Sequence, residues 1–482
     1  MSGETRVSFV SLGCAKNVVD SEKMLGQLAE AGCAITADED DAQVTVINTC
    51  GFLEASRTEA DEVIREAVAR KRNGVLKRVV VAGCLVQRDK EAILERIQGV
   101  DALVGVNNRD DIVRAVLGTN GNVASPLVGD ARAATAPRTR GSAMRSHRPV
   151  KRTTDVYLSD YHPFIQLDTA RLRITPRHYA YLRISEGCDQ KCTFCTIPSI
   201  RGPMHCKPPE IVLAEARELV SDGAVEINLI GQDTTSYGMG EDKLDTGLAG
   251  LLRQLNAVDG LRWLRLMYVY PSVLSDEMID AIAECEHVCK YIDVPLQHIN
   301  DHILKAMHRR VDRAGTERLL QKIRDRIPGV AVRTTLIAGF PGETDEQVTE
   351  LVEFLKAFRF DALGVFPYSL EPETPAGRMS DQVSEAVKQD RVAALMQAQQ
   401  EVAFALADER VGREFEVLVD ERVQPDAVAA RHQGQAPAVD SVTFVETREA
   451  RPGEFLTVRC AERRGYDLIS RPTRLGLPVL GR

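Results

Sequence analysis

The chain has 482 residues, a formal net charge of −9 and a pI near 5.7. Its 44% hydrophobic and 27% charged residues are typical of a globular protein with a large core, and the length suggests about three domains. No run of about 18 apolar residues occurs, which argues against a membrane-spanning helix, and the acidic balance argues against a surface built to neutralise many phosphates. The N-terminus has no secretory pattern, so we expect a cytoplasmic protein whose eleven cysteines stay reduced.

Short apolar runs alternate with amphipathic, helix-like stretches from residue 6 to about residue 120. The runs lie at residues 6–13, 43–50, 78–84 and 101–106. This alternation predicts a doubly wound parallel sheet covered by helices. Cys14, Cys50 and Cys84 each stand just past the end of a predicted strand. Because the carboxyl ends of parallel strands meet at one edge of a sheet, we expect the three thiols to converge there.

Residues 131–152 change in character to Ala, Thr, Ser, Pro and Arg, with seven Lys or Arg and no Asp or Glu. We interpret this stretch as a flexible, basic spacer inside a linker or insertion that spans 123–176. A basic arm that contacts an anionic partner is the alternative interpretation.

From Tyr179 the strand–helix alternation resumes with longer units. The predicted strands lie at 179–185, 226–231, 261–270, 291–297, 330–339 and 362–369, and a long helix covers 382–410. Six such units predict a partial, TIM-like (β/α)6 barrel with its active site at the carboxyl ends of the strands. Residues 411–482 become strand-like with Gly and Pro turns, which predicts a small all-β barrel. The expected fold is therefore α/β, with domains at 1–122, 177–409 and 410–482.

The stretch "EGCDQKCTFC" at 186–195 places Cys188, Cys192 and Cys195 directly after the first strand of the predicted barrel. A zinc site would need a fourth ligand, for which His205 and Cys206 are candidates. An iron–sulfur cluster held by three thiolates would instead leave one iron free to bind a substrate or cofactor. This spacing, with Phe194 before the last cysteine, resembles the radical S-adenosylmethionine (SAM) superfamily. The resemblance implies that the free iron chelates SAM and that an electron from the cluster cleaves it to a 5′-deoxyadenosyl radical.

Other residues at the ends of predicted strands are candidates for cofactor binding. Gln232 and Asp233 follow one strand, where the start of a capped helix is the alternative explanation. Gly339 and Gly342 follow another, where they would let the backbone approach a ligand or would form a tight strand-to-helix turn. Arg333 is a candidate for binding a carboxylate, with a structural ion pair as the alternative.

Four further cysteines are expected in the hydrophobic core. They are Cys33, Cys285, Cys289 and Cys460. We expect Cys285 and Cys289 to lie four residues apart on one helix, which makes a metal pair geometrically feasible.

The stretches "SLGCAKNVVDSE", "INTCGF" and "AGC", the three cysteines at 188–195 and the C-terminal barrel resemble the methylthiotransferases from end to end. Within that family the chain is most similar to the branch that modifies a ribosomal protein (RimO), rather than the branch that modifies tRNA (MiaB). The stretches "HYAYLRISEGCDQKCTFCTIPSIRGP" and "YIDVPLQHINDHILKAMHR" carry this similarity. One departure is "MHCKP" at 204–208, which leaves the contribution of His205, Cys206 and Lys207 open.

The resemblance implies that a methylthio group is added to the β-carbon of an aspartate in the decoding-centre protein of the small ribosomal subunit, the twelfth of that subunit. It implies two 4Fe-4S clusters, with the second on Cys14, Cys50 and Cys84, and SAM as both radical source and methyl donor. The implied partners are the ribosomal protein, free or on the subunit, and an electron donor such as flavodoxin or ferredoxin. We expect a monomer without membrane association.

Two alternatives to this function stay open. One is a tRNA adenosine methylthiotransferase, and the other is a non-catalytic, zinc-bound protein associated with RNA or the ribosome. Residues 411–482 hold 11 Lys or Arg and 11 Asp or Glu, so the C-terminal barrel has no net charge. A neutral barrel is better suited to a basic ribosomal protein than to RNA.

Overall fold

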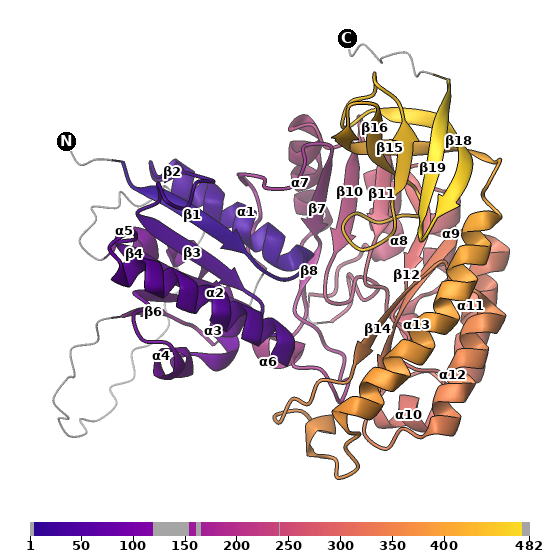
Figure 1. The fold of residues 1–482 in the computed structure, drawn as a ribbon, viewed down its shortest axis with the longest axis horizontal. Helices are drawn as coiled ribbons and strands as arrows, with labels where there is room; N and C mark the ends of the chain where they lie inside the picture. The colour runs from indigo at the N-terminus through magenta and orange to yellow at the C-terminus, as the bar shows by residue number, and fades with distance from the viewer. Residues whose placement is uncertain (1–3, 119–153, 161–164, 241, 475–482) are drawn as a thin grey trace.

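The computed structural model describes residues 4–118, 154–160, 165–240 and 242–474. Two parallel sheets and a closed barrel follow one another along the chain (Figure 1). The predicted basic spacer at 131–152 lies outside the described residues. A search of the described part of the chain finds no helix with the length and apolar character needed to cross a membrane.

The N-terminal sheet is parallel throughout, with strand order β2-β1-β3-β4-β5-β6. Its strands are β1 (Arg6–Ser11), β2 (Ala34–Ile35), β3 (Val44–Thr49), β4 (Arg78–Gly83), β5 (Ala102–Gly105) and β6 (Asp155–Tyr157). Its helices are α1 (Ala15–Glu30), α2 (Glu54–Arg72), α3 (Cys84–Asp89), α4 (Ala92–Arg96), η1 (Val106–Asp111) and α5 (Ile112–Leu117). Every residue of β3 is buried, as expected of a parallel strand covered on both faces.

Two separate cores lie on the two faces of this sheet. Met24 and Leu28 of α1 pack with α5 on one face. Ile64 of α2 and Leu85 of α3 pack with α4 on the other. The sheet is therefore doubly wound, in agreement with the prediction from the alternating strand and helix patterns.

The central sheet is also parallel, with order β14-β13-β12-β11-β10-β7. Its strands are β7 (Tyr179–Arg183), β10 (Glu226–Ile230), β11 (Trp263–Leu266), β12 (Val288–Asp293), β13 (Ala331–Ala338) and β14 (Ala362–Pro367). Its helices are α6 (Ile197–Arg201), α7 (Pro209–Ser221), α8 (Leu248–Asn256), η2 (Pro271–Val273), α9 (Asp276–Glu284), α10 (Asp301–Ala306), α11 (Arg313–Arg326), α12 (Asp345–Phe358), η3 (Ala376–Arg378) and α13 (Glu385–Asp408). A short hairpin pairs β8 (Ser185–Glu186) with β9 (His205–Cys206).

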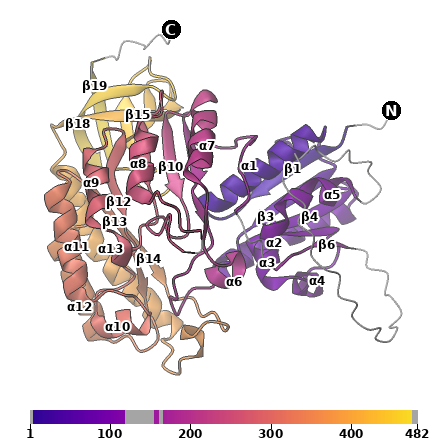
Figure 2. The same ribbon diagram turned by 180° about the vertical axis from the view of Figure 1, so that it is seen from behind.

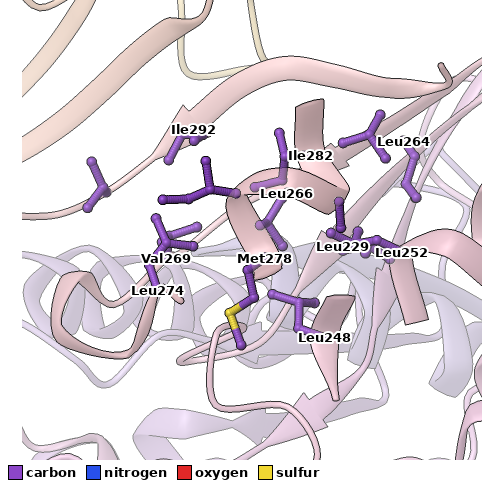
Figure 3. Close-up of a cluster of buried hydrophobic side chains, with 14 of the residues drawn as sticks. Leu229, Leu248, Leu252, Leu264, Leu266, Val269, Leu274, Met278, Ile282 and Ile292 are labelled. Atoms are coloured by element: carbon purple, nitrogen blue, oxygen red, sulfur yellow. The ribbon is translucent and has the colours of Figure 1, made fainter. Parts of the chain in front are cut away.

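The main core of the protein lies between this sheet and its helices. Helices α7, α8, α9, α11 and α12 cover the outer face of the sheet (Figure 2). Figure 3 shows Leu229, Leu264 and Ile292 from the strands packing against Leu252 of α8 and Ile282 of α9. The opposite, concave face is free of these helices and carries charged side chains. These include Arg265, which is completely buried.

The C-terminal barrel is closed in the order β15-β16-β17-β19-β18. Its strands are β15 (Glu414–Gln424), β16 (Ala427–His432), β17 (Thr443–Glu446), β18 (Phe455–Arg464) and β19 (Asp467–Arg474). The barrel packs on the concave side of the central sheet, where Arg265 Nη1 donates to Gln433 O at 2.6 Å and Tyr291 Oη donates to Asp440 Oδ2 at 2.9 Å. The two parallel sheets and the closed barrel confirm the predicted α/β fold with a small all-β barrel.

The range predicted as linker, 123–176, contains ordered structure among its described residues. β6 adds an edge strand to the N-terminal sheet by pairing in parallel with β5. Further along, Leu172 N donates to Glu22 O of α1 at 3.0 Å. A strand of three residues is too short to give a periodic signal in the sequence, which explains why it was not anticipated.

Candidate active site

Cys14, Cys50 and Cys84 lie at the carboxyl ends of three adjacent strands of the N-terminal sheet. Cys14 directly precedes α1, Cys50 follows β3, and Cys84 is the first residue of α3. β1, β3 and β4 are neighbours in parallel register, and the three thiols interact electrostatically with one another. The carboxyl ends of β1 and β3 point toward the central sheet (Figure 1). We call these cysteines the N-terminal triad.

Two of the turns that present these thiols depend on a preceding glycine. Gly13 and Gly83 have φ angles of +95° and +97°, in the left-handed region that glycine adopts without strain. A Cβ on Gly13 would meet Cys50 Cβ at 2.9 Å, and a Cβ on Gly83 would meet Asn48 Oδ1 at 2.2 Å. These glycines therefore let the strand ends pack closely around the thiols.

Asn17, in the first turn of α1, ties the three cysteine-bearing loops together. Its Nδ2 donates to Leu12 O and to Thr49 O, both at 2.9 Å. Its Oδ1 accepts a hydrogen bond from Cys84 Sγ at 3.4 Å. Because Asn17 is buried and bonds to all three strand ends, its amide sets the spacing of the loops.

A cation from the central domain reaches the same edge. Arg201, the last residue of α6, is 4% exposed. Its Nη2 lies 3.1 Å from Cys84 Sγ, 2.8 Å from Asn17 Oδ1 and 3.0 Å from Asp20 Oδ2. Its Nη1 donates to Glu186 Oε1 at 2.9 Å. Arg201 therefore joins the N-terminal triad to Glu186 of β8, two residues before Cys188.

Arg201 belongs to a buried network of alternating charges between the two domains. Asp20 Oδ1 also accepts from Arg183 Nη1 at 2.8 Å and from Arg109 Nη1 at 3.0 Å. Burial acts to raise the pKa of Asp20 and of Glu186, but the neighbouring guanidinium groups outweigh burial and lower both. The carboxylates are therefore ionised, and each buried guanidinium has its counter-charge.

Cys188, Cys192 and Cys195 lie in the loop after β8, and all three are partly exposed. We call them the central triad. Cys195 N donates to Cys192 O at 3.2 Å, which turns the loop so that the thiols are neighbours. Arg309 Nη1 lies 3.5 Å from Cys192 Sγ, and the guanidinium stacks 4.1 Å from the centre of the Tyr270 ring. Each triad thus has one guanidinium in contact with one sulfur.

The chemistry of both triads fits iron–sulfur clusters. Burial raises the pKa of Cys84, Cys188 and Cys195 to about 12 each, so thiolates at these positions need bound cations. Among the described residues, no three His, Cys, Asp or Glu side chains are gathered closely enough to bind one metal ion. A cluster binds each thiolate at a different iron and so accepts sulfurs that are further apart.

Lys16 lies beside the N-terminal triad and contacts the central domain. It stands two residues after Cys14 on α1, is 6% exposed, and places Nζ 3.0 Å from the centre of the Tyr268 ring, just beyond β11. Burial lowers the pKa of Lys16 to about 8. Tyr268 has a φ of +61°, a strained conformation for a bulky residue and one that is concentrated at functional sites.

Phe194 and Gln232, two predicted cofactor-binding residues, lie near the central triad. Phe194 packs against an apolar cluster that includes Met307 and Phe340. Gln232 Nε2 donates to Glu186 Oε1 at 2.8 Å. Its Oε1 is buried and has no hydrogen-bond partner among the described residues, so this acceptor is available to a ligand.

Asp233, Gly339 and Gly342 make their contacts within the protein. Asp233 accepts hydrogen bonds from the hydroxyls of Thr235 and Ser236 at 2.6 Å each, which closes its own turn. Gly339 N donates to Glu343 Oε1 at 3.0 Å, and a Cβ on Gly339 would lie 2.3 Å from Lys388 Cγ of α13. Gly342 N donates to Asp381 O at 2.9 Å. The close backbone approach at Gly339 is therefore to α13.

Arg333 forms ion pairs at the junction with the C-terminal barrel. Its Nη1 donates to Asp293 Oδ1 at 2.8 Å, and its Nε lies 3.4 Å from Asp440 Oδ1. Both of these ion-pair partners are carboxylates of the protein, and Nη1 also donates to Thr335 Oγ1 at 3.3 Å. Arg333 therefore forms the structural ion pair that the sequence analysis gave as the alternative.

The departure "MHCKP" has a structural explanation. His205 and Cys206 form β9, and Cys206 N donates to Asp242 Oδ2 at 2.7 Å. Lys207 is fully buried, and its Nζ contacts Asp168 Oδ2 at 2.7 Å and Glu215 Oε2 at 2.5 Å. Lys207 therefore anchors the segment before β7 to α7.

The predicted helical pair of Cys285 and Cys289 is wrong. Cys285 follows the last residue of α9, whereas Cys289 lies in β12, because the chain turns between them into the strand. Both are buried in hydrophobic clusters, as are Cys33 and Cys460, which confirms the expectation of core cysteines.

Sequence reasoning missed three cationic residues of this site. They are Lys16, Arg201 and Arg309. Lys16 and Arg201 stand within a few residues of a cysteine of one triad, and this adjacency was the available signal. Burial and partners distinguish these residues from ordinary surface cations, and neither can be read from their neighbours in the chain.

Three family models match the chain. They are the Uncharacterized protein family UPF0004 at residues 6–105, the Radical SAM superfamily at 182–355 and the TRAM domain at 411–472. The first two cover the strands whose ends carry the N-terminal and central triads, and the third covers the small barrel.

Curated relatives match the chain over nearly its whole length. The chain is 40% identical to "Ribosomal protein uS12 methylthiotransferase RimO" of Anaeromyxobacter sp. (strain K), over 98% of this chain and 96% of the relative. It is also 40% identical to the protein of that name from Lachnoclostridium phytofermentans, over 96% of this chain and 99% of the relative.

Solved structures share the fold at low sequence identity. The radical S-adenosylmethionine methyltransferase TsrM from Kitasatospora setae, with cobalamin and a [4Fe-4S] cluster bound, aligns with a TM-score of 0.52 at 16% identity. The alignment covers 78% of this chain and 74% of TsrM. At this identity the similarity concerns the fold alone.

Proposed function

The chain belongs to the RimO family of ribosomal protein uS12 methylthiotransferases, and on that premise we propose that it adds a methylthio group to the β-carbon of an aspartate in uS12. It is a SAM-dependent enzyme of the radical SAM superfamily. The observation that carries the proposal is the link between the two triads through the buried Arg201, which contacts Cys84 and also Glu186, two residues before Cys188. A radical site and a sulfur site must both reach one substrate carbon, and this link supports such an arrangement.

The reaction explains why cofactors are needed. The β C–H bond of an aspartate is unactivated, so proton abstraction by a side chain is inadequate and a cofactor must do the hard chemistry. The radical SAM family implies a 4Fe-4S cluster and SAM. We assign that cluster to Cys188, Cys192 and Cys195, and a second 4Fe-4S cluster to the N-terminal triad. When bound, these groups and SAM supply hydrogen abstraction, sulfur and the methyl group.

The protein's own residues hold this chemistry in place. Asn17 sets the spacing of the three N-terminal loops. Arg201 compensates negative charge on Cys84, and Arg309 does so on Cys192. Tyr270 stacks with Arg309, and Tyr268 covers the region near Lys16. These aromatic rings cover part of the site and limit the access of water to it.

We also propose that residues beside the central triad bind SAM. Gln232 has the best support, because its buried Oε1 lacks a partner among the described residues. Phe194 offers an apolar surface next to Cys195. Asp233, Gly339 and Gly342 remain candidates by their positions after strand ends, and Arg333, within β13, remains a candidate for binding a carboxylate, although the observed contacts of all four are internal.

The proposed partners follow from the substrate. The protein would take uS12 free or on the small subunit, receive electrons from a carrier such as flavodoxin or ferredoxin, and work as a monomer in the cytoplasm. The absence of net charge in residues 411–482 supports a basic protein over RNA as the partner of the C-terminal barrel.

A gene deletion tests the function directly. We expect uS12 from the wild-type strain to carry a methylthio group and uS12 from the deletion strain to lack it, as measured by intact mass. An unchanged uS12 mass would reject the substrate. Loss of a methylthio-adenosine from tRNA nucleosides in the same strain would favour the tRNA enzyme instead. Anaerobically purified protein with zinc and no iron would favour the non-catalytic alternative.

A further inference from the structure

Lys16 is a buried cation that forms no ion pair with a carboxylate among the described residues, and the strongest negative charge acting on it comes from Cys14, two residues before it. The residue is 6% exposed. Within the described part of the chain, it forms no ion pair or hydrogen bond, and its one close polar contact is the face of the Tyr268 ring. An aromatic face attracts the positive charge but leaves the three N–H donors of the ammonium unused.

The carboxylates whose charges act on Lys16 are already engaged by other groups. They are Asp293 and Glu186. Asp293 accepts from Arg333 Nη1 at 2.8 Å and from Tyr268 N at 3.1 Å. Glu186 pairs with Arg201 at 2.9 Å and with Arg183. Arg201 also acts on Lys16 and adds positive charge. Cys14 also acts on Lys16 with negative charge, but it is a proposed ligand of the N-terminal cluster, and neither carboxylate forms an ion pair with Nζ, so Nζ can pair with an incoming anion.

The position of Lys16 relates it to both triads. Along α1 it is two residues from Cys14, which is exposed and so leaves this edge reachable from solvent. Through Tyr268 it contacts the segment after β11, two residues before Tyr270, whose Oη lies 3.9 Å from Cys192 Sγ. Tyr268 holds its ring under the ammonium from a strained backbone conformation, which costs stability and is retained where function requires it.

We propose that Lys16 recognises the substrate by binding the side-chain carboxylate of the aspartate to be modified. The inference rests on the proposed function. The carboxylate carbon is bonded directly to the β-carbon, so an ion pair with Lys16 holds the reacting carbon one bond from the bound carboxylate, beside the N-terminal triad. Lys16 is thus a positioning residue that also selects an aspartate over neutral residues, because an uncharged side chain would leave the ammonium buried and unpaired.

The experiment is a cycle between enzyme and substrate variants, with the holoenzyme handled anaerobically. Wild type and Lys16→Met are each tested against recombinant uS12 and against uS12 in which the target aspartate is changed to Asn. Equilibrium binding is measured by fluorescence anisotropy, and KM and kcat are measured for the unchanged substrate. We expect the wild type to bind the Asp form about tenfold more tightly than the Asn form, the scale of one charge-assisted contact.

Lys16→Met is expected to lose this preference and bind both forms equally, with a rise in KM of about tenfold. SAM cleavage in the absence of uS12 and the iron content are measured for every variant, and binding and kcat are expressed per chain with assembled clusters. Lys16→Arg keeps the charge and should retain the preference for Asp. Lys23→Met is the matched control, because Lys23 lies on the same helix but donates to Thr169 O at 2.7 Å, away from the triads.

The proposal would be overturned if Lys16→Met still bound the Asp form more tightly than the Asn form by the wild-type ratio. It would also be overturned if Lys16→Arg lost this preference. If Lys16→Met does not assemble its clusters, Lys16→Gln provides a second neutral variant, judged by the same Asp/Asn ratio. Failure of the proposed function is a different result, because the wild type would then leave uS12 unmodified.

Discussion

The two cysteine triads are built in opposite ways. The central triad comes from one loop of eight residues, so its spacing is local. The N-terminal triad comes from three strand ends that only the sheet brings together, and Asn17 and Arg201 then tie them. The comparison teaches that three thiols can be gathered in two ways. A single loop gathers the central triad, whereas a sheet gathers the N-terminal triad and residues of two domains then hold it.

The arginines beside the two triads differ in the same way, because one comes from the domain of its own triad and the other comes from the neighbouring domain. Arg309 belongs to the domain of its own triad and is held by Tyr270 and by Pro295 O at 2.6 Å. Arg201 crosses from the other domain and is held by a buried acidic network. We therefore expect a substitution of Arg201 to lower both the stability of the protein and the occupancy of the N-terminal site. A substitution of Arg309 should affect the central triad alone.

The largest expected effect separates the chemical roles of the triads. Cys192→Ala should abolish both SAM cleavage and methylthiolation. Cys50→Ala should leave SAM cleavage intact and abolish methylthiolation, because it removes a thiol of the proposed sulfur site alone. The measurement is product analysis for 5′-deoxyadenosine and for modified uS12. Retained methylthiolation by the Cys50 variant would contradict the two-cluster assignment.

The next effect concerns the dependence of the N-terminal triad on the domain junction. Arg201→Met leaves Asp20 and Glu186 each without one buried partner, which should lower the free energy of unfolding by about 3–5 kcal/mol. It should also release the N-terminal cluster and reduce bound iron from about eight to about four atoms per chain. Anaerobic chemical unfolding and iron analysis measure these changes.

A matched control for this variant is Arg253→Met, whose ion pairs with Glu277 and Glu284 are on the surface. It should change neither stability nor iron content measurably, because exposed ion pairs contribute little. Equal iron loss from the two triads in Arg201→Met would contradict the distinct dependence that we infer.

The smallest effect is electrostatic and local to the central triad. Arg309→Met removes a positive charge 3.5 Å from Cys192 Sγ, which should disfavour the more negative, reduced cluster and lower its reduction potential by roughly tens of millivolts. Redox titration followed by electron paramagnetic resonance, in a Cys50→Ala background, isolates the central cluster. An unchanged or higher potential would show that the guanidinium does not act on it.

Much of the fold follows from patterns along the chain, and the exceptions are informative. The alternation of apolar runs and helices predicted both parallel sheets, and the turn-rich end predicted the barrel. β6 was missed because its three residues pair with β5 only after a long excursion of the chain.

The sequence by itself determined the six cysteines and the strand ends that carry them, because cysteine spacing and strand periodicity are properties of neighbouring residues. The tertiary structure alone decided which charges surround the thiols. Arg201 contacts Cys84 across 117 residues of sequence, and Lys16 reaches Tyr268 across the domain junction. The burial of each cation and the identity of its partners determine what it does at this site. Both depend on how the two domains pack.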